Sequence, residues 1–255
     1  MLVAIVIAIM VLAACVTLHE LGHFLAAKAV GVHPSCFSLG FGPKLWSTTR
    51  NNTEWRISAL PFGAYVRLPD DIEEDLSLPR QSVVYAAGPF ANYLAAVLAL
   101  VCLTVFGPNT SERTVADGFI FPAVAMVETL KSIPAGIDSG GRDFEGPVGI
   151  VKVGGGMVDN GEVLTDAEHP EPPTPWIRVF VLFAVLNVAL MVTNLMPIPV
   201  FDGGRMLLAG ISGFGTLLLR RSWRIPEAAQ TAVLVVTTIP LFGLVLLITF
   251  HDIFQ

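Results

Sequence analysis

The sequence has few charged residues: Asp, Glu, Lys and Arg make up 14% of its 255 residues, against about 25% in a typical soluble domain. Hydrophobic residues account for 53%. This composition excludes a soluble globular enzyme and a disordered chain, and the formal net charge of −6 argues against a nucleic-acid partner. Cysteine is also scarce. The three cysteines form no Cys-x-x-Cys pair, which excludes a disulfide framework and a zinc site built from cysteines.

Long uncharged stretches dominate the rest of the sequence. Three of them each exceed the roughly 20 residues that cross a bilayer as a helix, and a fourth begins at the N-terminus. Backbone polar groups cannot stay unpaired in lipid, so all four are predicted to be helical. We therefore expect an all-α membrane protein with four transmembrane helices, forming one domain over 1–255. The predicted spans cover about 1–29, 83–106, 177–201 and 228–250.

The first stretch has a second interpretation, because Leu12-Ala13-Ala14-Cys15 resembles the cleavage box of a bacterial lipoprotein. A signal peptide starts with positive charge, whereas the first Lys or Arg here is Lys28. We therefore expect the first stretch to be a retained span.

The loops between the predicted helices differ in their content of Lys and Arg. Residues 29–82 and 202–227 are rich in basic residues, whereas the longer 107–175 loop is acidic. Cytoplasmic loops carry an excess of Lys and Arg. We therefore expect a multi-pass protein of the cell inner (cytoplasmic) membrane, with both termini extracytoplasmic and the two basic loops in the cytoplasm.

The first predicted helix contains an H-E-x-x-H motif, His19-Glu20-Leu21-Gly22-His23. Residues four apart share one face of a helix, so the two imidazoles can bind one Zn²⁺ and Glu20 can reach a water beside it. Ionisable groups inside a membrane helix are costly unless they are paired, and they mark functional sites. The alternative is a cluster that only reaches toward the membrane interface, which such short side chains disfavour.

A catalytic zinc needs a third protein ligand, and Asp202 is the best-placed candidate. The first and third spans run in the same direction, and at about 1.5 Å per residue His19 and Asp202 reach similar depths. Two prolines before Asp202 break the helix, and two glycines after it let the backbone turn. The alternative role of Asp202 is the N-cap of the next helix.

Residues 36–67 alternate apolar with small or polar side chains around an Asn51-Asn52 turn, which predicts strands. We expect a membrane-associated β-loop on the cytoplasmic side. Gly40, Gly42 and Gly63 allow bends and close backbone approach. An open sheet edge can pair with an extended substrate strand, so these glycines are candidate substrate-binding residues. A small amphipathic sheet on the membrane surface is the alternative.

Three further segments have simpler predictions. Met206–Leu219 is expected to be a short interfacial or half-inserted helix, and Phe121–Ile133 is expected to lie on the outer face of the membrane. The small residues of Ala87–Asn92 favour close helix packing, and Asn92 is expected to hydrogen-bond either the third span or a substrate.

Taken together and in this order, six motifs resemble those of the site-2 protease family of intramembrane zinc metalloproteases, in particular its bacterial RseP-type group. They are His19–His23, Ser38–Pro43, Leu60–Val66, Ala87–Asn92, Gly146–Ile150 and Asn194–Arg205. The resemblance implies that His19, His23 and Asp202 bind one zinc, and that Glu20 is the catalytic base. It also implies that Asn187 and Asn194 lie near the bound substrate.

The resemblance also implies what the protein acts on and where. Its substrates would be single-span membrane proteins, such as anti-sigma factors or leftover signal peptides, cut toward the cytoplasmic side of the bilayer after an upstream site-1 protease. The 107–175 loop would stand in place of the PDZ domains common in the group. Two alternatives stay open: a zinc-binding membrane chaperone or scaffold that does not cut, for which Glu20 is not needed, and a metal transporter, which would carry polar residues on several helices.

Overall fold

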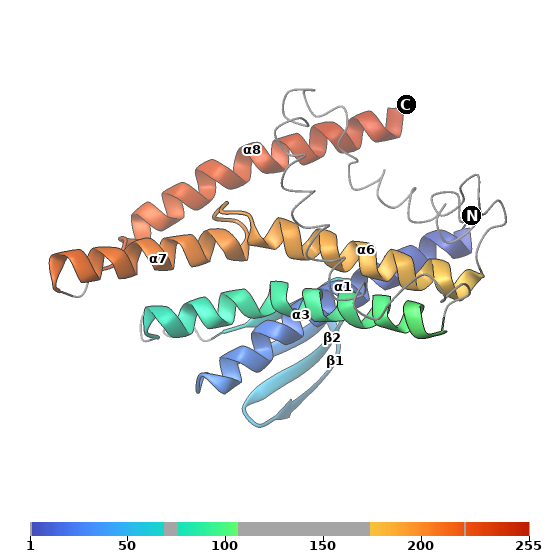
Figure 1. The fold of residues 1–255 in the computed structure, drawn as a ribbon, viewed down its shortest axis with the longest axis horizontal. Coiled ribbons are helices and arrows are strands. Elements are labelled where there is room, and N and C mark those ends of the chain that lie inside the picture. Colours follow the sequence, from blue (N-terminus) through green and yellow to red (C-terminus); the bar gives the residue numbers. More distant parts are fainter. Residues whose placement is uncertain (1, 69–75, 107–173, 222, 255) are drawn as a thin grey trace. The chain divides into compact units, whose positions relative to one another are not determined.

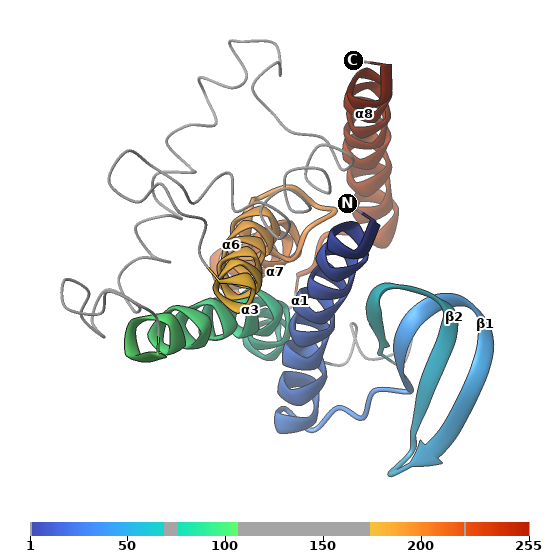
Figure 2. The same cartoon turned by 90° about the vertical axis from the view of Figure 1, so that its right-hand side faces the viewer.

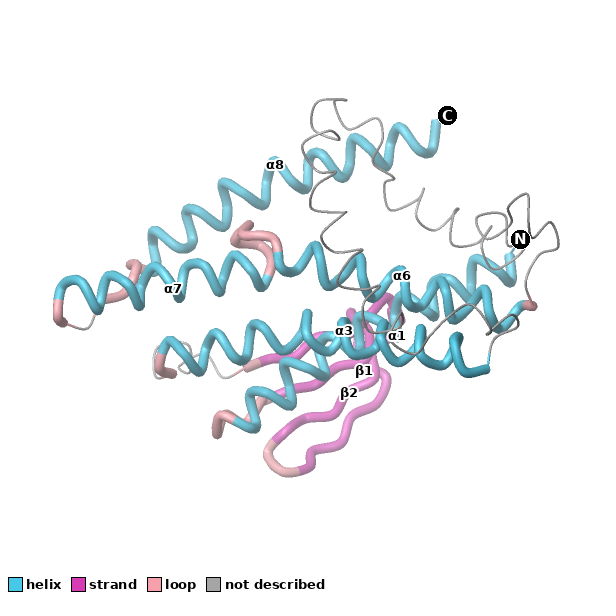
Figure 3. Tube along the Cα trace, viewed as in Figure 1, coloured by secondary structure: helices cyan, strands magenta, loops and turns pink. Residues whose placement is uncertain are grey.

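The computed structural model describes residues 2–68, 76–106, 174–221 and 223–254, and these are mostly helical (Figures 1 and 3). The elements in chain order are α1 (Leu2–Ala29), β1 (Cys36–Arg50), β2 (Thr53–Arg67), α3 (Leu78–Phe106), α6 (Pro175–Leu195), α7 (Asp202–Leu219) and α8 (Glu227–Phe254). The predicted strand region 36–67 is therefore a β-hairpin. Most of the predicted 107–175 loop, including Phe121–Ile133, lies outside the described residues.

Three of the described helices are long and apolar enough to cross a membrane: α1, α3 over Leu78–Leu103, and α6. Each overlaps one of the predicted spans, although α3 begins at Leu78 and not at residue 83. The fourth predicted span, 228–250, is also helical as part of α8, and its passage through the membrane stays a prediction.

The segment between α6 and α7 departs from the predicted boundaries. The third span was expected to reach residue 201, but α6 ends at Leu195, because Pro197 and Pro199 cannot continue a helix. α7 begins at Asp202. Its N-cap is Phe201, in extended conformation and without a side-chain cap. The alternative role of Asp202 as an N-cap is therefore wrong, since Asp202 is already helical.

Two glycines make this tight turn possible. A Cβ on Gly203 would overlap the Leu195 carbonyl oxygen, and one on Gly204 would overlap the Ile198 carbonyl. The sequence predicted that these glycines let the backbone turn. In the structure both lie in the first turn of α7, and glycine is required there because two backbone segments approach closely.

The chain divides into two compact units. The first comprises Met1–Cys15, Tyr93–Val192 and Gly243–Gln255. Its buried cluster joins α1 to α6 and is apolar apart from one thiol. The members are Ala4, Ala8, Val11, Cys15, Leu182 and Leu186. Those from α1 are spaced by three or four residues, so that one face of the helix packs against α6.

The second unit comprises Val16–Asn92 and Thr193–Phe242. Within it, the hairpin lies beside the C-terminal half of α1 (Figure 2). An aromatic cluster joins them: the ring centroids of Phe24, Phe37 and Trp55 lie 5.1–5.5 Å apart. α1 also packs closely on α3, since a Cβ on Gly22 would overlap the Ala87 carbonyl oxygen.

The hairpin is antiparallel and strongly bent. Its turn residues Asn51 and Asn52 both have positive φ angles, as expected for a tight two-residue turn. Phe37 pairs with both Trp55 and Val66, so the start of β1 lies between two stretches of β2. The bends fall at Gly40, Gly42 and Gly63, with φ of 84°, 82° and 128°. The predicted bends at these glycines are confirmed.

Candidate metal centre

α1 presents His19 and His23 one turn apart on the same face. The Nε2 atoms of the two rings lie 3.1 Å apart, and His19 is 7% exposed. A helix over the whole H-E-x-x-H motif is what makes this pairing possible. The predicted geometry of the two imidazoles is therefore present.

Asp202 supplies a third donor atom at the same point. Its Oδ2 lies 3.0 Å from His19 Nε2 and 3.2 Å from His23 Nε2. The carboxylate form of Asp202 is the one that binds a metal.

The three donors fit a zinc ion. Nitrogen and oxygen ligands lie about 2.1 Å from zinc, so two ligands of one tetrahedral ion are about 3.4 Å apart. The three observed separations, 3.0, 3.1 and 3.2 Å, are close to that value. Three protein ligands also leave a fourth position open, as in catalytic rather than structural zinc sites.

α3 supports the two histidines through two residues that are eight positions apart, Val84 and Asn92. The Nδ1 of His23 lies 2.8 Å from the Val84 carbonyl oxygen. A carbonyl can only accept, so this nitrogen carries the proton and Nε2 is left free to bind a metal. The Nδ1 of His19 lies 3.1 Å from the side-chain nitrogen of Asn92.

Gly88, between these two supports, leaves room for the imidazoles. A Cβ at this position would overlap His23 Nε2 and would lie 2.6 Å from His19 Cε1. The absence of a side chain here is therefore a requirement of the centre and not only of helix packing.

Glu20 contacts the hairpin. Its Oε2 accepts a hydrogen bond from the backbone N–H of Val66, at 3.0 Å. Val66 belongs to the stretch of β2 that pairs with the start of β1. The sheet therefore holds the carboxylate of Glu20, which lies between His19 and His23 in the sequence. A carboxylate beside a metal position is the group that moves protons in such sites.

The other predicted site residues lie in three different settings. Asn187 is fully buried in the first unit, where its side-chain nitrogen donates to the Phe183 carbonyl and contacts Cys15 Sγ. Asn194 is half-buried near the end of α6. Gly40, Gly42 and Gly63 lie on the hairpin. Contact of these residues with a substrate stays a prediction, whereas Asn92 lies against His19.

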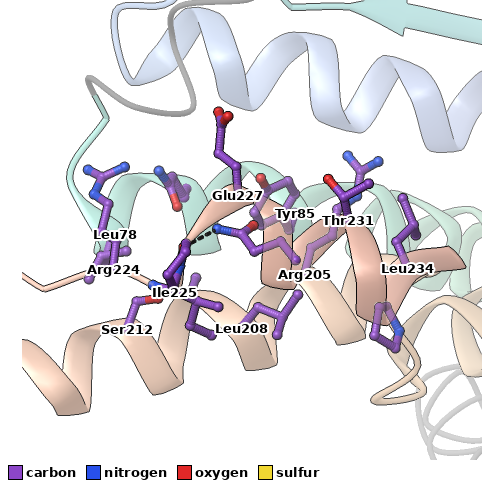
Figure 4. Close-up of a pocket in the computed structure, with 15 residues that line it drawn as sticks. Leu78, Tyr85, Arg205, Leu208, Ser212, Arg224, Ile225, Glu227, Thr231 and Leu234 are labelled. Atoms are coloured by element: carbon purple, nitrogen blue, oxygen red, sulfur yellow. Dashed lines mark hydrogen bonds between the residues drawn. The ribbon is translucent and has the colours of Figure 1, made fainter. Parts of the chain in front are cut away.

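A cavity of about 640 Å³ lies in the second unit, lined by α3, α7, the 224–226 segment and the start of α8 (Figure 4). Pro199 and Arg205, which flank Asp202 in the sequence, both line it. The guanidinium of Arg205 lies 5.8 Å from the ring of Tyr85, within cation–π range. The cavity therefore extends along the segment that carries the third ligand.

Sequence reasoning missed three supporting features: the space at Gly88, the Val84 carbonyl on His23, and the Val66 N–H on Glu20. One signal was available. A spacing of four residues places side chains on one face of a helix. This spacing relates Val84, Gly88 and Asn92 in the sequence, and it also relates the two histidines. The role of a backbone carbonyl or amide has no sequence signal.

Comparison with known proteins agrees with this geometry. The model of a protein family described as Peptidase family M50 matches residues 7–239. Three relatives from bacteria bear the name "Putative zinc metalloprotease". That of Chlamydia trachomatis is 37% identical over 142 residues, covering 47% of this chain and 23% of the relative. That of Pasteurella multocida is 38% identical over 122 residues, covering 43% and 28%. That of Nostoc sp. is 35% identical over 144 residues, covering 51% and 39%.

The aligned part of this chain thus spans about a quarter to two fifths of the length of these relatives. The family match is far wider and includes His19, Glu20, His23 and Asp202. Together with the apolar helices it identifies a multi-pass membrane protein, and it implies a zinc cofactor, which the three ligands fit. The chain belongs to peptidase family M50, the site-2 protease family.

Proposed function

We propose that this protein is a zinc metalloprotease that hydrolyses peptide bonds in or near the transmembrane segments of single-span membrane proteins. The observation that carries the proposal is the convergence of His19, His23 and Asp202 on one point, with Glu20 beside them on α1. The relatives' names and the family membership support it.

The chemistry divides between the metal and Glu20. When bound by the three ligands, zinc supplies a Lewis acid that polarises a peptide carbonyl and makes water more acidic. The Glu20 carboxylate accepts a proton from the attacking water and passes it to the leaving amine. The N–H of Val66 orients Glu20 for this task.

The hairpin is the proposed docking edge for the substrate. A peptide must be extended to expose its carbonyl, and an extended peptide can add to a sheet edge. The stretch of β2 around Val66 lies against Glu20, so a strand added there would pass close to the centre. Gly40, Gly42 and Gly63 shape this part of the sheet, and Asn187 and Asn194 are the proposed contacts from α6.

A transmembrane substrate must first unwind, because its backbone is already hydrogen-bonded as a helix. We therefore expect cut sites near helix-weakening residues such as Gly, Pro, Asn or Ser. The cavity beside Pro199 and Arg205 is the proposed polar route by which water reaches the reaction.

The proposed topology follows the distribution of Lys and Arg. The protein lies in the cell inner membrane with four spans, both termini extracytoplasmic and the centre toward the cytoplasm. Regulated intramembrane proteolysis is the corresponding role: an upstream site-1 protease makes a first cut outside, and this protein then cuts the anchored remnant of an anti-sigma factor or a signal peptide.

The test is cleavage of a panel of co-expressed single-span proteins by the wild-type chain and by Glu20→Gln, with bound zinc measured for both. Glu20→Gln is expected to keep zinc and to cut roughly 10²–10⁴-fold more slowly, the usual contribution of a general base. If neither chain cuts any substrate while both bind zinc, the chaperone or scaffold alternative replaces the proposal. Zinc uptake into vesicles by the wild-type chain would instead indicate a transporter.

A further inference from the structure

Asn92 is a polar side chain with no exposed surface, near the middle of an apolar helix. Burying an amide is costly unless it makes hydrogen bonds. The contact that the structure gives it is with a candidate metal ligand, at 3.1 Å from His19 Nδ1. The position of Asn92 therefore needs an explanation that involves His19.

The ligand role of His19 requires a particular tautomer. Its Nε2 faces His23 and Asp202, so Nε2 must be free of a proton when it binds a metal. The ring proton then lies on Nδ1, and this N–H needs an acceptor. For His23 the acceptor is the Val84 carbonyl. For His19 the neighbouring group is the Asn92 carboxamide.

The carboxamide can serve both forms of the ring. As the structure places the amide, its NH₂ group faces Nδ1 of His19, which therefore accepts the hydrogen bond. The other end of the amide, Oδ1, is buried and makes no hydrogen bond to any residue that the structure describes. Turning the amide by half a revolution would bring Oδ1 against Nδ1–H, so that the unsatisfied oxygen gains a partner and Nε2 becomes a ligand.

We propose that Asn92 is a positioning residue of the metal centre: its side-chain oxygen accepts the Nδ1–H of His19 in the zinc-bound protein and so fixes the tautomer and orientation of this ligand. The inference rests on the zinc binding in the proposed function. It departs from the sequence-based expectation that Asn92 bonds the third span or a substrate, because its partner His19 lies on the first span, α1.

The test compares zinc affinity among full-length chains in detergent, by competition with a chromophoric chelator. Asn92→Leu keeps the size of the side chain and removes the hydrogen bond, so zinc affinity should fall about 10- to 100-fold, as is typical for the loss of such a partner. Asn92→Asp keeps an acceptor oxygen and should bind zinc within a few-fold of the wild-type chain. Asn92→Ala serves in place of the leucine variant if that variant does not fold.

Asn187→Leu is the matched control, because Asn187 is equally buried on an apolar helix but bonds Phe183 and Cys15 instead of a ligand. Its zinc affinity should equal that of the wild-type chain. Thermal unfolding of the metal-free proteins separates loss of fold from loss of ligand orientation.

Three results would overturn the inference: wild-type affinity in Asn92→Leu, equal weakening in Asn92→Leu and Asn92→Asp, or equal weakening in Asn187→Leu. A wild-type chain that binds no zinc would overturn the proposed function as well, so the two failures are distinguishable.

Discussion

Asn187 and Asn92 are both fully buried on apolar helices, yet they contact different groups. In the first unit, Asn187 bonds the carbonyl one turn earlier in its own helix, at Phe183, and the thiol of Cys15. In the second unit, Asn92 bonds the imidazole of His19. The first amide holds apolar helices together, whereas the second supports a group that can bind a metal.

The two halves of α1 differ in the same way, since one makes apolar contacts and the other makes polar ones. Its N-terminal half buries Ala4, Ala8 and Cys15 against α6. Its C-terminal half, in the other unit, carries His19, Glu20 and His23, and each contacts a polar group of another element: Asn92, the Val66 N–H and the Val84 carbonyl. In α1, the polar side chains whose partners converge on one point are those of the candidate metal centre.

Among the variants considered, Gly88→Ala should have the largest effect on zinc binding and cleavage. In an ordinary helix the change stabilises by about 0.5–1 kcal/mol, but here the methyl group would overlap His23 and crowd His19. We expect loss of zinc binding and at least a 10²-fold loss of cleavage, measured by metal content and substrate turnover. Gly210→Ala, in α7 with nothing within 4 Å of the added Cβ, is the control and should keep both. Full zinc content in Gly88→Ala would refute the packing described for the centre.

Gly63→Ala should separate cleavage from zinc binding. The residue has φ of 128°, where other residues are strained by about 1–3 kcal/mol, and its Cβ would lie 3.1 Å from Val16 Cγ1. The shift should disturb the β2 stretch that holds Glu20. We expect roughly a tenfold slower cleavage with zinc affinity unchanged. Parallel loss of zinc and activity would show that the hairpin supports the ligands and not the base.

Asn187→Leu tests the first unit. Losing the hydrogen bonds to Phe183 and Cys15 should lower the free energy of unfolding by about 1 kcal/mol, seen as a lower midpoint in a thermal melt. Cys15→Ala should remove part of the same interaction. A large loss of zinc affinity in either variant would contradict the division of roles between the two buried asparagines.

Glu54→Gln should give the smallest effect. The hydrogen bond from Lys44 Nζ, at 2.6 Å, lowers the pKa of the exposed Glu54 carboxyl below its usual value of 4.5. Such a group stabilises the fold above its unfolded pKa, and the contribution is lost as the pH falls through the lower folded pKa. The wild-type chain should therefore lose slightly more thermal stability than Glu54→Gln between pH 6 and pH 3. Identical pH dependence would show that this surface pair contributes nothing.

The sequence predicted those parts of the protein that depend on residue type and spacing. Uncharged length located the helices, alternation and Asn51-Asn52 located the hairpin, and the four-residue spacing of His19 and His23 predicted their pairing. Asp202 was identified because proline and glycine around it require an irregular backbone, and the structure brings it to both histidines.

What the sequence could not show depends on how elements pack. The predicted partner of Asn92 was the third span or a substrate, because nothing in the sequence of α3 says that its small-residue face meets His19 and His23 of α1. Val84 and Val66 bond His23 and Glu20 through backbone atoms. Because every residue has a backbone carbonyl, the residue type at these positions gives no signal. The exact end of α6 at Leu195 is set by prolines that were recognised, but the predicted span was extended past them.

The most direct test of the central claim is the zinc content of the purified full-length chain with and without the third ligand. We expect one zinc per chain in Glu20→Gln and none in Glu20→Gln combined with Asp202→Ala, measured by elemental analysis after removal of loosely bound metal. Equal zinc in both proteins would contradict the account, because the histidines of α1 would then bind the metal without α7.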